Sequence, residues 1–197
     1  MHPTVYSRLV ELMSRYGSAG PETLEVGAAE GVSRSFARII GGNYTGISLA
    51  NEAEYEWGRI VHGNGNCMTF SDSSFDNLIC NAMLEHDHHF WMTLAEIRRV
   101  LRPGGLFYCG VPGFPGHRRH TRIALGFNSL MPRRFQRSAF ADWLGGVGVY
   151  PFHAAPDDYY RFSEQAVRKI FFEGFEVLEL GSVLRLPRVI GVGRRVA

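Results

Sequence analysis

The hydrophobic residues of this chain follow two spacings, one helical and one typical of buried strands. Val5, Leu9, Leu12 and Tyr16 recur every three to four positions, which predicts a helix over residues 4–16. Short apolar runs bounded by Gly, Pro, Asn or Ser predict strands. The predicted helices lie at residues 4–16, 32–40, 51–57, 87–102 and 163–172, and the predicted strands at residues 22–26, 44–49, 59–62, 75–82, 106–111, 175–180 and 188–192.

Capping residues mark the start of several of these helices. Asn51 is followed three residues later by Glu54, a capping-box arrangement that predicts a helix through Trp57. Asp87 is a good N-cap for the next helix, which is expected to begin there and to end at Pro103.

The order of the elements predicts an α/β fold with a doubly wound, mostly parallel sheet, because strands alternate with helices. The short connection between the last two strands predicts an antiparallel hairpin at the C-terminal end. Residues 113–162 lack the alternation and are rich in Pro, Gly, Arg, His and aromatic residues, so we expect an inserted lid. A length of 197 residues with 45% hydrophobic content predicts one domain over residues 1–197, with residues 1–20 as an N-terminal helix.

Composition narrows the classes of function. A formal net charge of +2 gives no general argument for binding nucleic acid or a membrane. No apolar run is long enough to cross a bilayer and the first residues do not resemble a signal peptide, so we expect a cytoplasmic protein. Cys67, Cys80 and Cys109 lack paired metal-ligand spacing and are expected to be reduced thiols. Lys169 is the only lysine, which argues against lysine-based covalent catalysis.

The stretch Glu22–Gly31 carries the first functional signal. Thr23, Leu24 and Val26 suit a buried strand, and the glycines that follow suit a tight turn into a helix. Such a turn exposes backbone N–H groups at the carboxyl edge of a sheet, where nucleoside cofactors bind. The small residues stand at every second position, 27, 29 and 31, which differs from the Gly-x-Gly-x-x-Gly spacing of dinucleotide sites.

Three later segments make the assignment specific. They are Phe70 to Ile79, with a Phe-x-Asp-x-x-Phe-Asp pattern, Leu84-Glu85-His86, and Arg99 to Gly105, which reads Arg-Val-Leu-Arg-Pro-Gly-Gly. Together with the acid and small-residue turn at 25–31, this order resembles the type 11 family of class I S-adenosylmethionine-dependent methyltransferases. The resemblance implies a Rossmann-like methyltransferase fold and S-adenosylmethionine as the cofactor.

The resemblance also implies where the cofactor binds. Ser48 stands where the family has an acid for the ribose, and Asn64, or Asn66 if the register slips, stands where an acid reads the adenine amino group. Both can still form a hydrogen bond, although not a charge-assisted one. The expected cofactor-binding residues are Glu25, Gly27, Ala28, Ala29, Gly31, Ser48, Asn64, Met68, Asn81, Ala82 and His86, with Met68 covering the adenine and the last three near the sulfonium.

Methyl transfer to a hydroxyl requires positioning, exclusion of water and removal of a proton. His86, His153 and Tyr159 are the candidate catalytic residues. The run His86-Asp87-His88-His89 also permits a metal site. The simpler interpretation is a helix start, because adjacent histidines point in different directions, and we therefore expect no metal.

The expected lid is strongly basic. Between residues 113 and 140 there are six arginines and no acidic residue, a balance that suits an anionic small molecule, although these could equally be solvated faces. RNA is a weaker candidate for the acceptor, because no RNA-binding motif is visible. Asp158 and Arg161 are expected to pair where the lid returns to the domain. The expected substrate-facing residues of the lid are Arg118, Arg119, Arg133, Arg134, Tyr160 and Arg161.

The sequence therefore favours methyl transfer to an oxygen or nitrogen of a small molecule, such as a sugar or a secondary metabolite. A non-catalytic methyltransferase-like module is the first alternative, since Ala29, Ser48 and Asn64 depart from the family pattern. A nicotinamide-dependent oxidoreductase is the second, and the glycine spacing disfavours it. The oligomeric state is not readable from these features.

Overall fold

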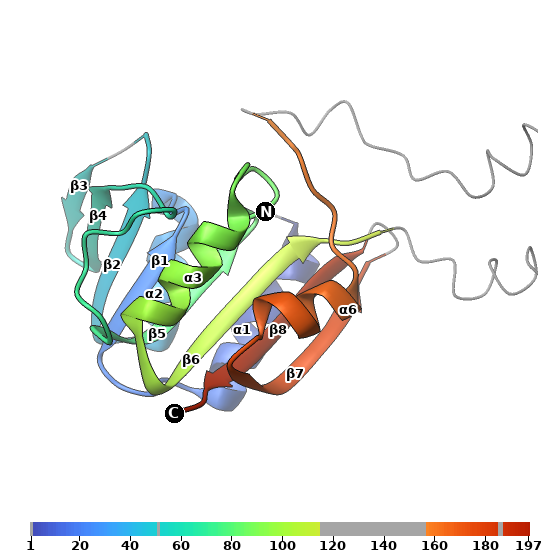
Figure 1. Ribbon diagram of the computed structural model, residues 1–197. Helices are drawn as coiled ribbons and strands as arrows, with labels where there is room; N and C mark the ends of the chain where they lie inside the picture. The colour runs from blue at the N-terminus through green and yellow to red at the C-terminus, as the bar shows by residue number, and fades with distance from the viewer. Residues whose placement is uncertain (1, 51, 115–156, 185–186) are drawn as a thin grey trace, which may run out of the picture.

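A computed structural model describes residues 2–50, 52–114, 157–184 and 187–197 (Figure 1). These residues form one eight-stranded sheet with the order β3-β4-β2-β1-β5-β6-β8-β7. The strands are β1 (Glu22–Val26), β2 (Asn43–Ser48), β3 (Ala53–Tyr55), β4 (Gly58–His62), β5 (Phe75–Asn81), β6 (Leu101–Pro112), β7 (Phe175–Val183) and β8 (Arg188–Arg195). The helices are α1 (Pro3–Tyr16), α2 (Glu30–Ile40), α3 (Phe90–Val100), the short α6 (Glu164–Ala166) and the π-helical η1 (Val167–Phe171).

The centre of the sheet is parallel and its C-terminal side is antiparallel. Strands β4, β2, β1, β5 and β6 pair in parallel, whereas β8 pairs antiparallel with both β6 and β7. The predicted doubly wound α/β sheet with a closing hairpin is confirmed.

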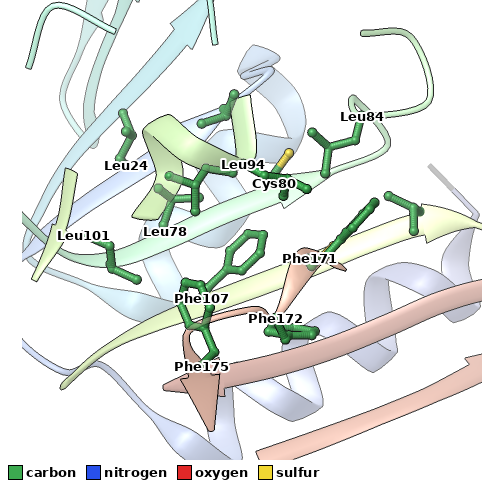
Figure 2. Packing of buried hydrophobic residues seen from close by; sticks show 14 of the residues in the cluster. Leu24, Leu78, Cys80, Leu84, Leu94, Leu101, Phe107, Phe171, Phe172 and Phe175 are labelled. Atoms are coloured by element: carbon green, nitrogen blue, oxygen red, sulfur yellow. The ribbon is translucent and has the colours of Figure 1, made fainter. Parts of the chain in front are cut away.

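Both faces of the sheet are covered, and successive residues of the central strands alternate between the two layers. In β5, Leu78 and Cys80 pack under α3 and η1, while Ile79 packs under α1 and α2. Figure 1 shows α3 and α6 in front of the sheet and α1 and α2 behind it. Figure 2 shows the front layer, where Phe107, Phe171, Phe172 and Phe175 meet the leucines of β1, β5 and α3.

The predicted helix at residues 51–57 is wrong. Asn51 lies outside the described residues, and Ala53–Tyr55 is strand β3, paired antiparallel with β4 through a two-residue turn. The rings of Tyr55 and Trp57 stack with centroids 4.7 Å apart, and Trp57 also meets the edge of Tyr44 at 5.9 Å. This aromatic packing onto β2 favours the hairpin over a capped helix, whose local advantage is small.

The helix expected to begin at Asp87 begins at Phe90 instead, with His89 as its N-cap. The Asp87 carboxylate accepts hydrogen bonds from the His89 N–H, from the Asn66 amide and from the Thr93 hydroxyl, and the N-cap position itself is His89. The same helix ends at Val100, and β6 starts at Leu101, five residues before the predicted strand. The last helix does begin after Ser163, whose side chain accepts a hydrogen bond from the Ala166 N–H.

The described part of the chain contains no helix that is long and apolar enough to cross a membrane. Cys80 and Cys109 are buried in neighbouring strands, as predicted, and burial raises the pKa of both thiols well above the ordinary range. Most of the expected lid, residues 115–156, lies outside the described residues.

Candidate functional site

The site lies where the strand order reverses. From β1 the chain proceeds outward through β2 and β4, and it then crosses back to place β5 on the other side of β1. The carboxyl ends of β1, β2, β4 and β5 all reach the same edge, because these strands are parallel. Ligands of open α/β sheets bind at such a switch point.

The turn after β1 has the conformation that its glycine predicts. Gly27 has a φ of +82°, and the N–H groups of Gly27 and Ala28 both donate to the Ile47 carbonyl, at 3.1 and 2.9 Å. A Cβ on Gly27 would stand 2.6 Å from Met83 Cγ, so the side chain of Met83 already packs against this glycine. A Cβ on Gly31 would meet no described heavy atom within 4 Å. The open approach to the turn is therefore at the first turn of α2, beside Gly31.

The α2 N-terminus suits an anionic or hydroxyl-rich ligand. Its N-cap is Ala29, which has no polar side chain to bind the free N–H groups of the first turn. The Ala29 N–H donates to Ser33 Oγ at 3.0 Å, which fixes the turn against the helix.

Glu25 is buried under the turn, with 3% of its surface exposed. Tyr44 donates its hydroxyl hydrogen to Glu25 Oε2 at 2.9 Å. Desolvation raises the pKa of Glu25 to about 7, although hydrogen bonds from Ser33 and Tyr44 act in the opposite direction. Because Ser33 also binds the Ala29 N–H, Glu25 is linked to the turn through that hydroxyl.

The positions expected to read the ribose and the adenine follow β2 and β4. Ser48 ends β2, partly exposed, and its Oγ accepts a hydrogen bond from the Ala50 N–H at 3.3 Å. Asn64 is exposed, and its Oδ1 accepts from the Asn66 N–H at 2.9 Å. Asn66 instead directs its amide into the protein, toward Asp87 and Thr93. Of the two asparagines, Asn64 is thus the exposed one, whereas Met68 is 7% exposed and belongs to the front core.

The exit of β5 is tightly constrained. Ala82 has a φ of +53°, a left-handed conformation that costs a non-glycine residue about 1 kcal/mol or more. Its N–H donates to the Gly110 carbonyl at 2.8 Å, and the Asn81 side chain lies over Gly110, where a Cβ would collide with it. Asn81 and Ala82 therefore stand at the same edge as the glycine turn, with Met83 between them and Gly27.

The Leu-Glu-His segment holds the chain that returns from residues 115–156. The Glu85 carbonyl accepts from the Tyr159 N–H at 2.8 Å, and the Nδ1–H of His86 donates to the Asp157 carbonyl. The neutral His86 ring consequently has its lone pair on Nε2. The Glu85 side chain is completely buried, and its Oε1 accepts from Arg188 at 2.8 Å.

Tyr159 is the most exposed of the candidate catalytic residues in the described chain, at 48%. Its hydroxyl donates to Asp157 Oδ2 at 3.0 Å, which raises the pKa of Tyr159. Tyr160 donates to the His88 carbonyl at 3.0 Å, and Arg161 pairs with Asp158, as predicted. Arg161 and Tyr160 thus fix the returning chain through protein contacts.

The remaining lid and catalytic candidates lie outside the described residues. They are Arg118, Arg119, Arg133, Arg134 and His153. Within the described ranges, no group of three or more His, Cys, Asp or Glu residues is arranged to hold a metal ion.

A depression of about 400 Å³ lies at the opposite, amino edge of β1 and β2. Its polar groups bind one another, as Asn43 donates to Glu22 at 2.6 Å and Arg59 to Thr45 at 3.4 Å. It is remote from the glycine turn, and the switch point remains the candidate site.

Sequence reasoning missed several residues that build the site. Thr93 is a polar residue on the apolar face of α3, and this break in the pattern is a signal that could have identified it. Glu85 lies inside the Leu84-Glu85-His86 segment that the sequence identified, but its ion pair with Arg188 is visible only in the structure. Met83 and Asp87 gave no sequence signal for the contacts they form.

Comparison with known proteins gives a consistent assignment. Residues 24–109 match the sequence model of the type 11 methyltransferase-domain family. A Mycolicibacterium smegmatis protein named as a probable S-adenosylmethionine-dependent methyltransferase is 32% identical over 117 residues, 56% of this chain and 44% of that protein. A demethylmenaquinone methyltransferase of Staphylococcus aureus is 30% identical over 93 residues, 46% of this chain and 38% of that protein. The matched region thus spans less than half the length of either relative.

The fold has a match over almost the whole chain. The structure of a Burkholderia thailandensis 1,6-didemethyltoxoflavin-N1-methyltransferase, solved with S-adenosylhomocysteine, aligns with a TM-score of 0.64 at 17% identity, covering 98% of this chain and 79% of that one. Residues 24–109 are therefore similar in sequence to the type 11 methyltransferase domain, and the sheet that contains them has the fold of a class I S-adenosylmethionine-dependent methyltransferase.

Proposed function

We propose that this protein transfers a methyl group from S-adenosylmethionine to an oxygen or nitrogen of a small-molecule acceptor. The observation that carries the proposal is the meeting of the glycine turn, the end of β2 and the Asn81–His86 segment at one edge of the sheet. When bound, S-adenosylmethionine supplies an electrophilic methyl group on a sulfonium.

The residues at this edge suit that cofactor. The uncapped first turn of α2 and the open approach beside Gly31 suit its methionine and ribose. Ser48 offers one hydroxyl to the ribose, and the exposed Asn64 offers a carbonyl oxygen to the adenine amino group. Asn81 and Ala82 flank the side on which the sulfonium would lie.

His86 is the proposed proton acceptor for a hydroxyl substrate. Its Nδ1–H is directed to the Asp157 carbonyl, which fixes the ring and makes Nε2 the basic atom. Tyr159 lies on the same returning segment and would orient the acceptor. His153 is a second candidate base outside the described residues.

The proposed acceptor is an anionic small molecule. The six arginines between residues 113 and 140 would attract a phosphate or a carboxylate. The acceptors in the names of the similar proteins, demethylmenaquinone and 1,6-didemethyltoxoflavin, are small molecules, which supports a small-molecule acceptor; its negative charge rests on the arginines alone.

Calorimetric titration with S-adenosylmethionine and S-adenosylhomocysteine tests the proposal, with NAD as the control. Micromolar binding of the first two and none of the third is expected for a working methyl-donor site. Binding of NAD alone would favour an oxidoreductase.

Ser48→Asp locates the binding site within the molecule. A carboxylate at the end of β2 can accept two hydrogen bonds from a ribose, so we expect S-adenosylhomocysteine to bind roughly tenfold more tightly. Ser71→Asp adds the same charge to an exposed loop and should change the affinity little. Equal effects of the two variants would contradict the proposed position of the ribose.

A non-catalytic module remains the second candidate, because Ser48 and Asn64 replace two cofactor-binding acids. That function predicts that wild type binds neither S-adenosylmethionine nor S-adenosylhomocysteine, while Ser48→Asp restores measurable binding.

A further inference from the structure

The loop between β4 and β5 is held against the start of α3 by a partly buried polar network. Asn66 Nδ2 donates to Asp87 Oδ2 at 2.8 Å and to Thr93 Oγ1 at 2.9 Å. Thr93, which is completely buried, donates its own hydroxyl hydrogen to Asp87 Oδ2 at 2.6 Å. The three side chains therefore form a closed triangle, in which Asp87 is the only charged member.

Packing reinforces this attachment. A Cβ on Gly65 would stand 2.7 Å from Thr93 Oγ1 and 3.2 Å from Val26, so the loop backbone lies directly on α3 and on the end of β1. Further along, the Met68 N–H donates to Glu96 at 2.7 Å, and the Met68 carbonyl accepts from Arg99 at 2.9 Å. One face of α3 thus determines the position of the whole loop.

Asp87 links the loop to the start of α3. It lies before the N-cap His89, and its Oδ1 accepts the His89 N–H at 2.9 Å, while Oδ2 accepts from Thr93 of the helix and from Asn66 of the loop. Holding a charged carboxylate in a partly buried place toward a loop amide has a free-energy cost. The contact between Asp87 and Asn66 has the effect of holding the loop in one conformation.

The residue that depends on this conformation is Asn64. Its Oδ1 accepts the Asn66 N–H at 2.9 Å, so the position of Asn66 decides which way the Asn64 amide faces. An unrestrained amide can rotate and present either its carbonyl oxygen or its NH₂ group. When the Asn64 amide presents its oxygen, it can accept a hydrogen bond from a purine amino group but not from a purine carbonyl. The opposite orientation presents NH₂ and reverses this preference.

We propose that Asp87 is a positioning residue that sets the base specificity of the cofactor site, because it fixes Asn66 and thereby the amide orientation of Asn64. This inference rests on the proposed function. Asp87 does not touch the cofactor, and its effect passes through the loop alone.

The test compares two ligands that differ at one position of the purine. S-adenosylhomocysteine carries a 6-amino group, whereas S-inosylhomocysteine carries a 6-carbonyl. Calorimetry on wild type is expected to show roughly tenfold tighter binding of the adenosyl ligand. Asp87→Ala should weaken the adenosyl ligand by about tenfold and the inosyl ligand much less, so that the ratio of affinities falls toward one.

Asp72→Ala is the matched control, since its side chain is 78% exposed and pairs with Arg99 on the same helix. It should leave both affinities within about twofold of wild type. The exchange Asn66→Asp with Asp87→Asn reverses donor and acceptor, and it should restore part of the preference that each single change removes.

The outcomes separate the two proposals. Failure of wild type to bind either ligand would contradict the proposed function. Binding of both ligands by wild type without a preference, or an equal loss of both in Asp87→Ala, would leave the cofactor site intact and overturn the role of Asp87.

Discussion

Asp76 belongs to the Phe-x-Asp-x-x-Phe-Asp pattern that identifies the family, yet it lies at the amino edge of the sheet, away from the candidate site. Its carboxylate accepts from the Glu22 N–H at 3.0 Å and from Arg102 at 2.6 Å. Arg102 comes from the Arg-Pro-Gly-Gly segment, so two family patterns meet in one ion pair. These motifs are explained by the fold rather than by the chemistry.

We expect Asp76→Ala to lower the free energy of unfolding by about 2 kcal/mol, because it leaves the partly buried Glu22 N–H without its acceptor and removes the ion pair with Arg102. Denaturant titration measures the loss. Affinity for S-adenosylhomocysteine should remain within about twofold of wild type, since the change is at the opposite edge. A large loss of affinity at unchanged stability would contradict this separation.

Glu25 predicts a pH dependence of stability. Its pKa is raised from 4.5 to about 7 in the folded protein, so folding favours the protonated form. The stabilisation is complete below the pKa of the unfolded chain and is lost as the pH rises through about 7. Relative to wild type, Glu25→Gln should therefore gain about 3 kcal/mol in free energy of unfolding between about pH 4 and pH 8.

The measurement is denaturant unfolding of both proteins across that range. Tyr44→Phe offers a second variant, because it removes a hydrogen bond to the charged form; it should raise the pKa of Glu25 further, so that the fall in stability is larger and extends to higher pH. A constant difference between Glu25→Gln and wild type would show that Glu25 does not titrate in this window.

At the scale of elements, the β3–β4 hairpin shows how tertiary packing overrides a local signal. Gly58 has a φ of +146°, and a Cβ there would collide with the Tyr44 carbonyl. This glycine lets the hairpin lie close to β2, where Trp57 and Tyr55 pack.

Gly58→Ala should therefore destabilise the protein by about 3 kcal/mol, through backbone strain and steric overlap together. Gly104→Ala is the matched control, because Gly104 also has a positive φ, +81°, but no atom of the described chain within 4 Å of a Cβ. It should cost about 1 kcal/mol. Denaturant titration measures both losses in free energy of unfolding. If Gly58→Ala and Gly104→Ala lose the same amount, the structure relieves the overlap with Tyr44 without a cost in stability.

The pattern of apolar residues predicted most strands and helices. Each helix buries one face at helical spacing, and each central strand buries both faces, so both leave a regular pattern in the sequence. It failed where side chains from distant elements decide the local structure. Tyr44 determines the hairpin at Ala53–Tyr55, and Asn66 occupies the carboxylate of Asp87 that was expected to cap α3. Neither partner is visible from the local sequence.

At the scale of the whole molecule, the candidate site joins segments that lie far apart in the chain. The family resemblance assigns the turn at 27–31 and the segment at 81–86 to one cofactor site, and both follow parallel strands that end at the same edge. Met83 packs against Gly27, and the Glu85 carbonyl accepts from the Tyr159 N–H. Both contacts depend on three-dimensional packing that the spacing of residues in the sequence does not reveal. The sequence therefore indicates which segments meet at this edge, but not the contacts that hold them in place.

A ligand bound at the switch point should stabilise the whole molecule, because the site is assembled from both halves of the parallel sheet. At a concentration of S-adenosylhomocysteine a hundred times its dissociation constant, binding should raise the free energy of unfolding by about 2.7 kcal/mol. For a chain of 197 residues this corresponds to a rise in Tm of roughly 5 to 10 °C. Thermal unfolding followed by calorimetry measures the shift, with NAD at the same concentration as the control.

Asp76→Ala should begin from a lower Tm and show the same increase in Tm on binding the ligand, since its loss of stability is independent of the site. An increment that disappears in this variant would mean that the amino edge and the cofactor site are coupled through the central strands.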